Sequence, residues 1–428
     1  MSKSKVIVYD TNKQDMKSII EDVFVNFPQD VKGKKVLIKP NMLGPFEVER
    51  GVTTNPVLIE ALVDYLIDCG ANIIVGDNPG GQGGGVIAAA KKSGIYQASK
   101  GHFENIGTAC QLFPMNSRFV KEINVSDAVL DCDILIDLPR FKTHAYAGIS
   151  GSIKNMFGIV VGPGKAKLHF ATPKPDDFHE LLVDLYQVRV PDLVIMDGIY
   201  AMEGMGPTTG NLKKIDKVLA STDGVALDAT MARMMGFDIE LIRHILVANE
   251  RNLGVYKEED IELVGDASKI EGFELPISYS AEVKATAPKM AGARLAMSMA
   301  MKEAGINLQD VNYINAHGTG TKINDKMETG AIAELFGHHA SDIMISSTKS
   351  MHGHMLGATG SIEAIVCALA IKEGFVPATT KTKELMEECE NLDIVLGTFR
   401  KEQIQYAVSN SFGFAGNSSS IVIGRYVC

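Results

Sequence analysis

The chain has 428 residues, of which 46% are hydrophobic and 22% charged, a composition typical of globular proteins and long enough for two hydrophobic cores. Its 42 basic and 52 acidic residues give a net charge of −10, which argues against nucleic acid as the main partner. No apolar stretch reaches membrane-spanning length and the cysteines are few and scattered, so we expect a cytoplasmic protein without membrane contact.

The first 275 residues alternate short apolar runs with helical patterns. The apolar runs are 36–38, 73–75, 134–138 and 193–196, and a helical pattern covers 58–66. Short runs of this kind between helices are typical of parallel strands in βαβ units. The sequence therefore predicts an α/β domain with a mainly parallel sheet over residues 1–276.

Polar side chains stand directly after several of these apolar runs. Because parallel sheets bind ligands at the carboxyl ends of their strands, we expect these side chains to share one rim of the sheet. Lys154, a basic residue that does not follow one of these runs, is also included in the set. The predicted substrate- or anion-binding residues are Lys39, Asn41, Asp77, Lys142, His144, Lys154 and Asp197.

A glycine-rich run at 76–85 follows the apolar run 73–75 and precedes a helical pattern at 86–92. Glycines let backbone N–H groups approach an anion, and a helix N-terminus favours negative charge. The pattern leaves two interpretations open, an anion- or phosphate-binding loop and a surface loop. The same choice, between receiving an anionic substrate and forming a solvated face, applies to the basic residues Lys142, His144, Lys154, Lys165, Lys167 and His169.

Hard or borderline metal ligands are scattered over the same segment without a compact ligand motif. They are Asp77, His144, Asp197, Glu203 and Asp228. These residue types admit a divalent metal in the first domain, at a site whose members the spacing leaves open. The six cysteines contain no C-x-x-C pair, so we expect no iron–sulfur cluster.

Several sequence motifs of this segment occur together in one known family. They lie at 36–42, 51–56, 74–81, 138–144, 151–158, 196–199, 202–207 and 222–228. With them, residues 5 to about 275 resemble the DUF362 family of α/β proteins. The biochemical activity of that family is poorly defined, so the resemblance implies a fold and a small-molecule site, with a metal-dependent or redox reaction as one option.

The pattern changes near residue 277, and three further motifs follow in order. They are 315–321 with 324–329, then 347–360, then 410–416. Residues 277 to about 423 resemble the C-terminal half of a β-ketoacyl-[acyl-carrier-protein] synthase II-like condensing enzyme. The resemblance implies a second domain over 277–428 with the C-terminal half of a thiolase-like (condensing enzyme) fold.

This resemblance also implies a catalytic set, made up of His317, His354, Lys349 and Phe412. The two histidines would stabilise the enolate oxygen formed when a malonyl thioester loses carbon dioxide. Lys349 would polarise the surroundings of His354, and Phe412 would gate the acyl pocket. The nucleophilic cysteine belongs to the family's other half, which we do not find. Cys110 follows Thr-Ala as a nucleophile would, but bulky residues come after it, and we expect a buried thiol in a strand.

Half of a condensing-enzyme fold would leave an apolar surface uncovered. We therefore expect a homo-oligomer or a ketosynthase partner chain held through residues 280–428, with acyl-carrier protein or an acyl thioester as ligand. Three functions stay open. They are an incomplete ketosynthase-like acyltransferase of fatty-acid or polyketide metabolism, a small-molecule enzyme acting through the first domain, and a fusion with no joint function.

Overall fold

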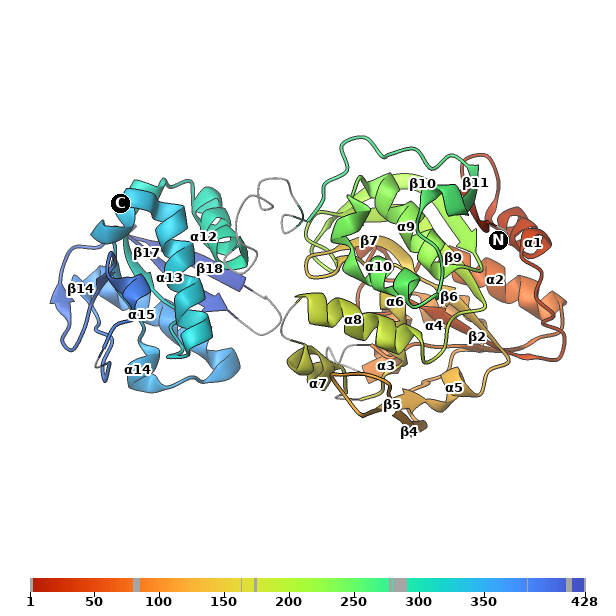
Figure 1. The fold of residues 1–428 in the computed structure, drawn as a ribbon, viewed down its shortest axis with the longest axis horizontal. Helices are drawn as coiled ribbons and strands as arrows, with labels where there is room; N and C mark the ends of the chain where they lie inside the picture. The colour runs from red at the N-terminus through yellow and green to blue at the C-terminus, as the bar shows by residue number, and fades with distance from the viewer. Residues whose placement is uncertain are drawn as a thin grey trace. The chain divides into compact units, whose positions relative to one another are not determined.

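The computed structural model describes residues 3–79, 85–162, 164–172, 175–276, 279, 291–382, 384–412 and 418–426. Contacts divide the chain into two units, Met1–Ser280 and Ala281–Cys428 (Figure 1). Both units combine helices with sheets that contain parallel strand pairs, which confirms the predicted α/β class. No helix in the described ranges is long and apolar enough to cross a membrane.

The first unit is built on a large mixed sheet. The strands of this sheet are β1 (Ser4–Asp10), β2 (Lys35–Pro40), β3 (Asn72–Val75), β6 (Ile134–Leu138), β7 (Arg140–His144), β8 (Gly148–Ile149), β9 (Leu193–Glu203), β10 (Asn211–Ser221) and β11 (Ile261–Gly265). Strands β4 (Cys110–Pro114) and β5 (Glu122–Ser126) form a separate two-stranded sheet. The main order is β11-β1-β10-β9-β6-β2-β3. Strands β9, β6, β2 and β3 pair in parallel, and β10 runs antiparallel to both of its neighbours. The sheet is therefore mainly parallel where the predicted binding residues lie.

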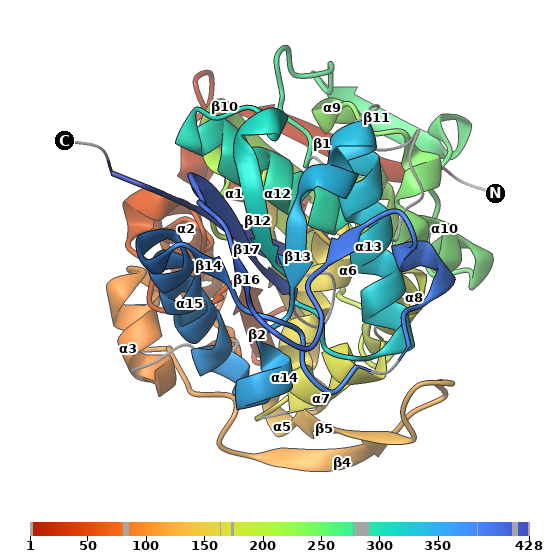
Figure 2. The ribbon, with the colours of Figure 1, turned by 90° about the vertical axis from the view of Figure 1, so that its left-hand side faces the viewer.

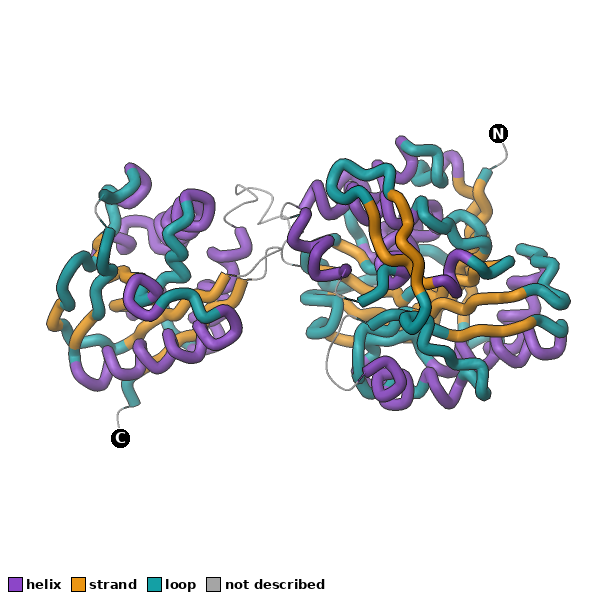
Figure 3. Tube along the Cα trace, turned by 90° about the horizontal axis from the view of Figure 1, so that it is seen from below, coloured by secondary structure: helices purple, strands orange, loops and turns teal. Residues whose placement is uncertain are grey.

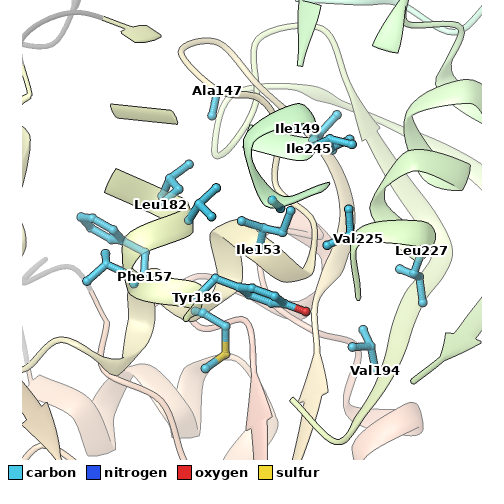
Figure 4. Close-up of a cluster of buried hydrophobic side chains, with 14 of the residues drawn as sticks. Ala147, Ile149, Ile153, Phe157, Leu182, Tyr186, Val194, Val225, Leu227 and Ile245 are labelled. Carbon is cyan, nitrogen blue, oxygen red and sulfur yellow. The ribbon is translucent and has the colours of Figure 1, made fainter. Parts of the chain in front are cut away.

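Helices cover both faces of this sheet (Figure 3). They are α1 (Met16–Asn26), α2 (Pro56–Asp68), α3 (Gly85–Lys92), α4 (Ile95–Ala98), α5 (Asp127–Leu130), α6 (Ser152–Asn155), α7 (Gly164–Ala171), α8 (Pro175–Tyr186), α9 (Gly224–Met235) and α10 (Arg243–Glu250), with a 3-10 turn η2 (Met156–Ile159). Successive strand residues point to opposite faces, so Val36 and Ile38 pack against α1 and α2 while Leu37 packs on the other side. Figure 4 shows the cluster on that other side, where Tyr186 and Ile153 lie among apolar residues.

Local signals fix where the helices of the first unit begin and end. The Asn55 side chain accepts a hydrogen bond from Val57 N–H, and Pro56 occupies the first turn of α2. Asp223 caps α9 in the same way, and Gly236 ends that helix at a φ of 88°, a conformation that glycine adopts without strain. These caps hold both helices against the sheet at defined starting residues.

The second unit has a smaller sheet, made up of β12 (Val311–Asn315), β13 (Met344–Ser346), β15 (Asp393–Ile394), β17 (Tyr406–Phe412) and β18 (Ser418–Gly424). Strands β14 (Phe375–Val376) and β16 (Arg400–Lys401) form a separate two-stranded sheet, and the helices are α12 (Ala291–Ala304), α13 (Lys322–Phe336), α14 (Lys349–His352) and α15 (Thr359–Glu373). The order β15-β13-β12-β17-β18 is parallel except for β18. Helices α12 and α13 pack on one face with Ile314, and α15 packs on the other with Tyr313 (Figure 2).

Candidate functional site

A buried ion pair lies at the centre of the predicted site in the first unit. Lys39 Nζ is 3.0 Å from Asp77 Oδ1, and both side chains are almost completely buried. Asp77 Oδ2 also accepts a hydrogen bond from Met42 N–H at 2.9 Å. A Cβ at Gly158 would stand 2.3 Å from Asp77 Oδ1 and 2.7 Å from Lys39 Nζ, so only glycine fits beside this pair. Asp77, which follows β3, and Gly158, in η2, therefore both lie beside Lys39 of β2.

A chain of directed hydrogen bonds extends this centre. Lys142 Nζ donates to Asn41 Oδ1 at 2.6 Å, and Asn41 Nδ2 donates to Asn155 Oδ1 at 2.8 Å. Asn155 Nδ2 then donates to Asp137 Oδ1 at 2.6 Å. Burial raises the pKa of Asp137 to about 6, against the charge of Lys39, which lowers it. Lysine, two amides and a carboxylate thus form one continuous network.

Two further lysines, Lys154 and Lys165, lie near Lys39 and Lys142. We name these four residues the lysine cluster. Lys165 is half-buried and donates to the backbone oxygen of Asn78. Burial, with Lys165 and Lys39 nearby, lowers the pKa of Lys154 to about 8. Burial also lowers the pKa of Lys165 to about 8 and that of Lys142 well below its ordinary value. The cluster is therefore a half-enclosed set of amines and not a solvated surface, whereas Lys167 is exposed.

His144 stands at the edge of this cluster. Its Nδ1 accepts hydrogen bonds from Tyr146 N–H at 3.1 Å and Ala147 N–H at 3.0 Å. Burial, with Lys154 and Lys142 nearby, lowers the pKa of His144 well below its usual value. The ring is therefore neutral and carries its proton on Nε2.

Asp197 differs from the other predicted residues. Arg140 forms a buried ion pair with its carboxylate, which also accepts Asn55 N–H at 2.7 Å and Ile199 N–H at 3.2 Å. These contacts satisfy Asp197 within the protein, so its role is structural. The prediction that it follows a strand end is wrong, because β9 continues from Leu193 to Glu203 on its pairing with β10. Lys39, Lys142 and His144 likewise lie within β2 and β7.

Three residues that build this site were not among the predicted binding residues. Asp137 lies inside an apolar strand and carries no recognisable signal, whereas Asn155 and Gly158, in α6 and η2, belong to the motif 151–158. The part of the chain that the structure describes holds no group of three or more His, Cys, Asp or Glu side chains able to bind a metal. Of the glycine-rich run 76–85 predicted to approach an anion, residues 80–84 lie outside the described residues. In its described part, the site consists of lysines, amides and the carboxylates of Asp77 and Asp137.

The second unit brings its predicted catalytic residues together. His317 follows β12, His354 lies between α14 and α15, and Phe412 ends β17. The ring centroid of His317 is 5.6 Å from that of His354 and 5.8 Å from that of Phe412. Burial, with Lys349 and His354 nearby, lowers the pKa of His317 to about 4, so this ring is neutral at pH 7. Of the last motif, 410–416, residues 413–416 lie outside the described residues.

Two buried carboxylates support these histidines, and the sequence did not single them out. Glu328 accepts hydrogen bonds from His317 N–H at 2.9 Å, Gly318 N–H at 2.8 Å and Asn410 Nδ2 at 3.1 Å. Glu363 forms a buried ion pair of 2.6 Å with Lys349. Glu328 thus ties the turn after β12 to β17, and Glu363 fixes the lysine that lowers the pKa of His317. The signal for Glu328 was its place in the motif 324–329.

The two cysteines that the structure describes in the second unit are poor nucleophiles. Cys367 and Cys389 are buried, and burial raises the pKa of Cys367 to about 12 and that of Cys389 above its ordinary value. In the first unit, Cys110 lies in β4 as expected, but its side chain is exposed and not buried. It belongs to a two-stranded sheet with β5, in which most residues of β4 are exposed.

Comparisons with known proteins divide the chain in the same order. Residues 36–233 match the family model "Domain of unknown function (DUF362)", and residues 269–383 match "Beta-ketoacyl synthase, C-terminal domain". Nodulation protein E of Rhizobium sp. (strain N33) is 50% identical over 129 residues, 30% of this chain and 32% of that protein. The 3-oxoacyl-[acyl-carrier-protein] synthase 2 of Synechocystis sp. is 38% identical over 191 residues, 45% of this chain and 43% of that protein.

One similar solved structure is the ishigamide ketosynthase/chain length factor, at 36% identity and a TM-score of 0.30, covering 32% of this chain and 33% of that one. The chain spans less than half the length of the curated relatives it matches. The chain therefore carries a segment that matches the DUF362 family, residues 36–233, followed by a segment that matches the β-ketoacyl synthase C-terminal domain, residues 269–383.

Proposed function

We propose that the second unit supplies the histidine half of a ketosynthase-type site that acts on acyl-carrier thioesters. The observation that carries this proposal is the convergence of His317, His354 and Phe412 from three separate segments. Their likeness to 3-oxoacyl-[acyl-carrier-protein] synthase 2 supports the choice of substrate class. Fatty-acid or polyketide condensation is the reaction context that this class implies.

The geometry fits the stabilisation of an enolate. When a malonyl thioester loses carbon dioxide, negative charge develops on the thioester oxygen, and hydrogen-bond donors aimed at that oxygen lower the barrier. His317 is a neutral imidazole because burial and Lys349 disfavour its protonation. A neutral ring donates one N–H without adding charge to a half-buried site. Phe412, beside the His317 ring, offers an apolar wall for an acyl chain.

The same unit lacks a thiol suited to carry an acyl group, within its described residues, since Cys367 and Cys389 are buried thiols with raised pKa values. Covalent catalysis by cysteine needs an accessible thiolate. We therefore propose decarboxylation without self-sufficient condensation.

The test is carbon dioxide release from malonyl-[acyl-carrier protein] by the full chain. His317→Ala and His354→Ala are each expected to reduce the rate by about a hundredfold, the effect of removing one oxyanion donor. His338→Ala is the matched control, because that histidine is exposed, and its rate should equal that of the wild type. Equal rates in all four proteins would refute the assignment of the two histidines.

We also propose that the second unit associates through α15, as a homodimer or with a ketosynthase chain. This helix is apolar around much of its circumference, and Ile365 and Leu369 are 58% and 46% exposed. Replacing both with glutamate in the full chain should convert a dimer into a monomer in light scattering, because charge on a buried apolar face opposes association. Val25→Glu, at an exposed position of α1, is the control and should leave the mass unchanged. A monomeric wild type would contradict the proposal.

For the first unit, we propose binding of a small anionic molecule at the lysine cluster. The cluster places four amines around a network whose carboxylates are Asp77 and Asp137. An excess of positive charge in a half-enclosed site costs free energy that a bound anion offsets. Lys154 supports this proposal most directly, because no described residue forms a hydrogen bond or ion pair with its amine.

Anion binding should weaken as pH rises through about 8, because Lys154 and Lys165 lose their charge near that pH. Sulfate keeps its charge between pH 6 and pH 9 and is therefore the probe, titrated by calorimetry at constant low ionic strength. Lys154→Gln should weaken sulfate binding at pH 7 by about tenfold, the loss of one charge-assisted hydrogen bond. The exposed Lys167→Gln should not change it. Affinity that is independent of pH and of Lys154 would contradict the proposal.

A further inference from the structure

Lys154 differs from the other members of the lysine cluster in having a free amine. Lys39 pairs with Asp77, and Lys165 donates to the backbone oxygen of Asn78. Lys142 donates to Asn41 Oδ1 and to the backbone oxygen of Val52. Within the described residues, no hydrogen bond or ion pair engages the amine of Lys154. Its side chain is half-buried, whereas Lys39 and Lys142 are completely buried. A ligand that enters the cluster therefore reaches Lys154 without displacing an existing partner.

The backbone that carries Lys154 is rigidly held. Asp228 Oδ1 and Oδ2 accept hydrogen bonds from Ser152 N–H at 2.7 Å and Ile153 N–H at 3.0 Å. Gly151 permits this approach, since a Cβ there would stand 2.1 Å from Asp228 Oδ1. Asn155 is fixed in the same turn by its bond to Asp137. The turn α6 thus presents Lys154 from a fixed position, as a reactive side chain requires.

The surroundings of Lys154 also make its amine reactive. Burial and the neighbouring Lys165 and Lys39 lower its pKa to about 8, so a larger fraction of the amine is neutral at pH 7 than in an ordinary exposed lysine. A partly desolvated lysine beside other cations is the environment in which lysine attacks carbonyl carbon.

We propose that Lys154 forms an imine with the carbonyl carbon of a short keto acid whose carboxylate lies against the half-buried Lys165. This inference rests on the anion-binding function proposed above. The neutral Lys154 nitrogen adds to the carbonyl carbon, and a proton passes from nitrogen to the former carbonyl oxygen. The resulting carbinolamine takes up one proton and loses water, which leaves a protonated imine. No oxidant or reductant enters the step.

Reduction of the imine by borohydride gives a stable amine that mass spectrometry detects. The full chain is incubated with pyruvate, acetoacetate or 2-oxoglutarate at pH 7, reduced, digested and mapped. The expected result is one adduct, on the peptide that contains Lys154, with at least one of these acids. Lys154→Arg keeps the positive charge but lacks a nucleophilic amine, so it should lose the adduct. Lys167→Arg, at an exposed position outside the lysine cluster, should keep both the adduct and sulfate binding.

The outcomes separate the two proposals for this site. Sulfate binding without any adduct on Lys154 overturns the imine and leaves the anion site standing. Adducts spread over exposed lysines, unchanged in Lys154→Arg, also overturn the imine. Failure to bind sulfate, together with no adduct, overturns both. Mapping of the wild-type chain decides the matter even if Lys154→Arg does not fold, because it depends on no variant.

Discussion

Arg140→Met is expected to destabilise the first unit by about 3–5 kcal/mol, the usual result of removing one partner of a buried ion pair. Arg140 and Asp197 are 2% and 0% exposed, and Arg140 also donates to Tyr200 O at 2.9 Å. Methionine fills a similar volume but cannot neutralise the Asp197 carboxylate. The carboxylate would keep its bonds to Asn55 N–H and Ile199 N–H, yet its charge would stay buried without a cation.

Hydrogen exchange of the first-unit core strands in increasing denaturant measures this change, since it reports the stability of one unit within the full chain. Arg118→Met is the matched control. Arg118 pairs with Asp177 and Glu180, but its side chain is 61% exposed, so its loss should cost less than about 1 kcal/mol. If Arg140→Met and Arg118→Met lowered the free energy of unfolding by similar amounts, the prediction that the buried ion pair contributes more stability than the exposed one would be wrong.

Lys349→Met is expected to destabilise the second unit by about 3–5 kcal/mol for the same physical reason. Its Nζ lies 2.6 Å from Glu363 Oε1, and the two side chains are 5% and 0% exposed. Glu363 stands on α15 among apolar residues, and burial already raises the pKa of its carboxyl group. Without Lys349, the carboxyl must either stay charged in an apolar environment or take up a proton.

A second substitution makes this expectation sharper. Adding Glu363→Leu to Lys349→Met removes the stranded carboxylate and should restore most of the lost stability, since a well-packed apolar pair often replaces a buried ion pair at little cost. Lys372→Met is the control on α15, the helix that also carries Glu363, because the ion pair of Lys372 with Glu373 is exposed. Exchange of the β12 and β17 amides gives the stability of this unit. A double variant less stable than Lys349→Met would contradict the account.

Much of the fold follows from short patterns in the sequence. The apolar runs at 36–38 and 134–138 form the buried strands β2 and β6, because β-branched and aliphatic residues in short uninterrupted runs pack on both faces of a parallel sheet. The length of β9 could not be predicted from such a pattern. Its pairing with β10 extends it past Asp197, and that pairing depends on a segment that begins well after the apolar run.

The sequence predicted some residues of the candidate sites and missed others, because some positions depend on partners that are distant in the sequence. Asn41 and Asp77 lie near each other because they follow the adjacent parallel strands β2 and β3, which a sequence can suggest. Lys39 and Lys142 join them from within β2 and β7. Asp137 and Glu363 could not be singled out, because a single acidic residue in an apolar run has no local sign of its buried partner. Arg140 is similar, since only the register of β7 with β9 sets it against Asp197.

The central claim is that the second unit handles an acyl-carrier thioester without completing a condensation. The most direct measurement incubates the full chain with acetyl- and malonyl-[acyl-carrier protein], then analyses carbon dioxide, acylated cysteine and β-ketoacyl product together. We expect carbon dioxide release that depends on His317 and His354, with no acylated cysteine and no β-ketoacyl product. An acylated cysteine that passes its acyl group to a β-ketoacyl product would contradict the account.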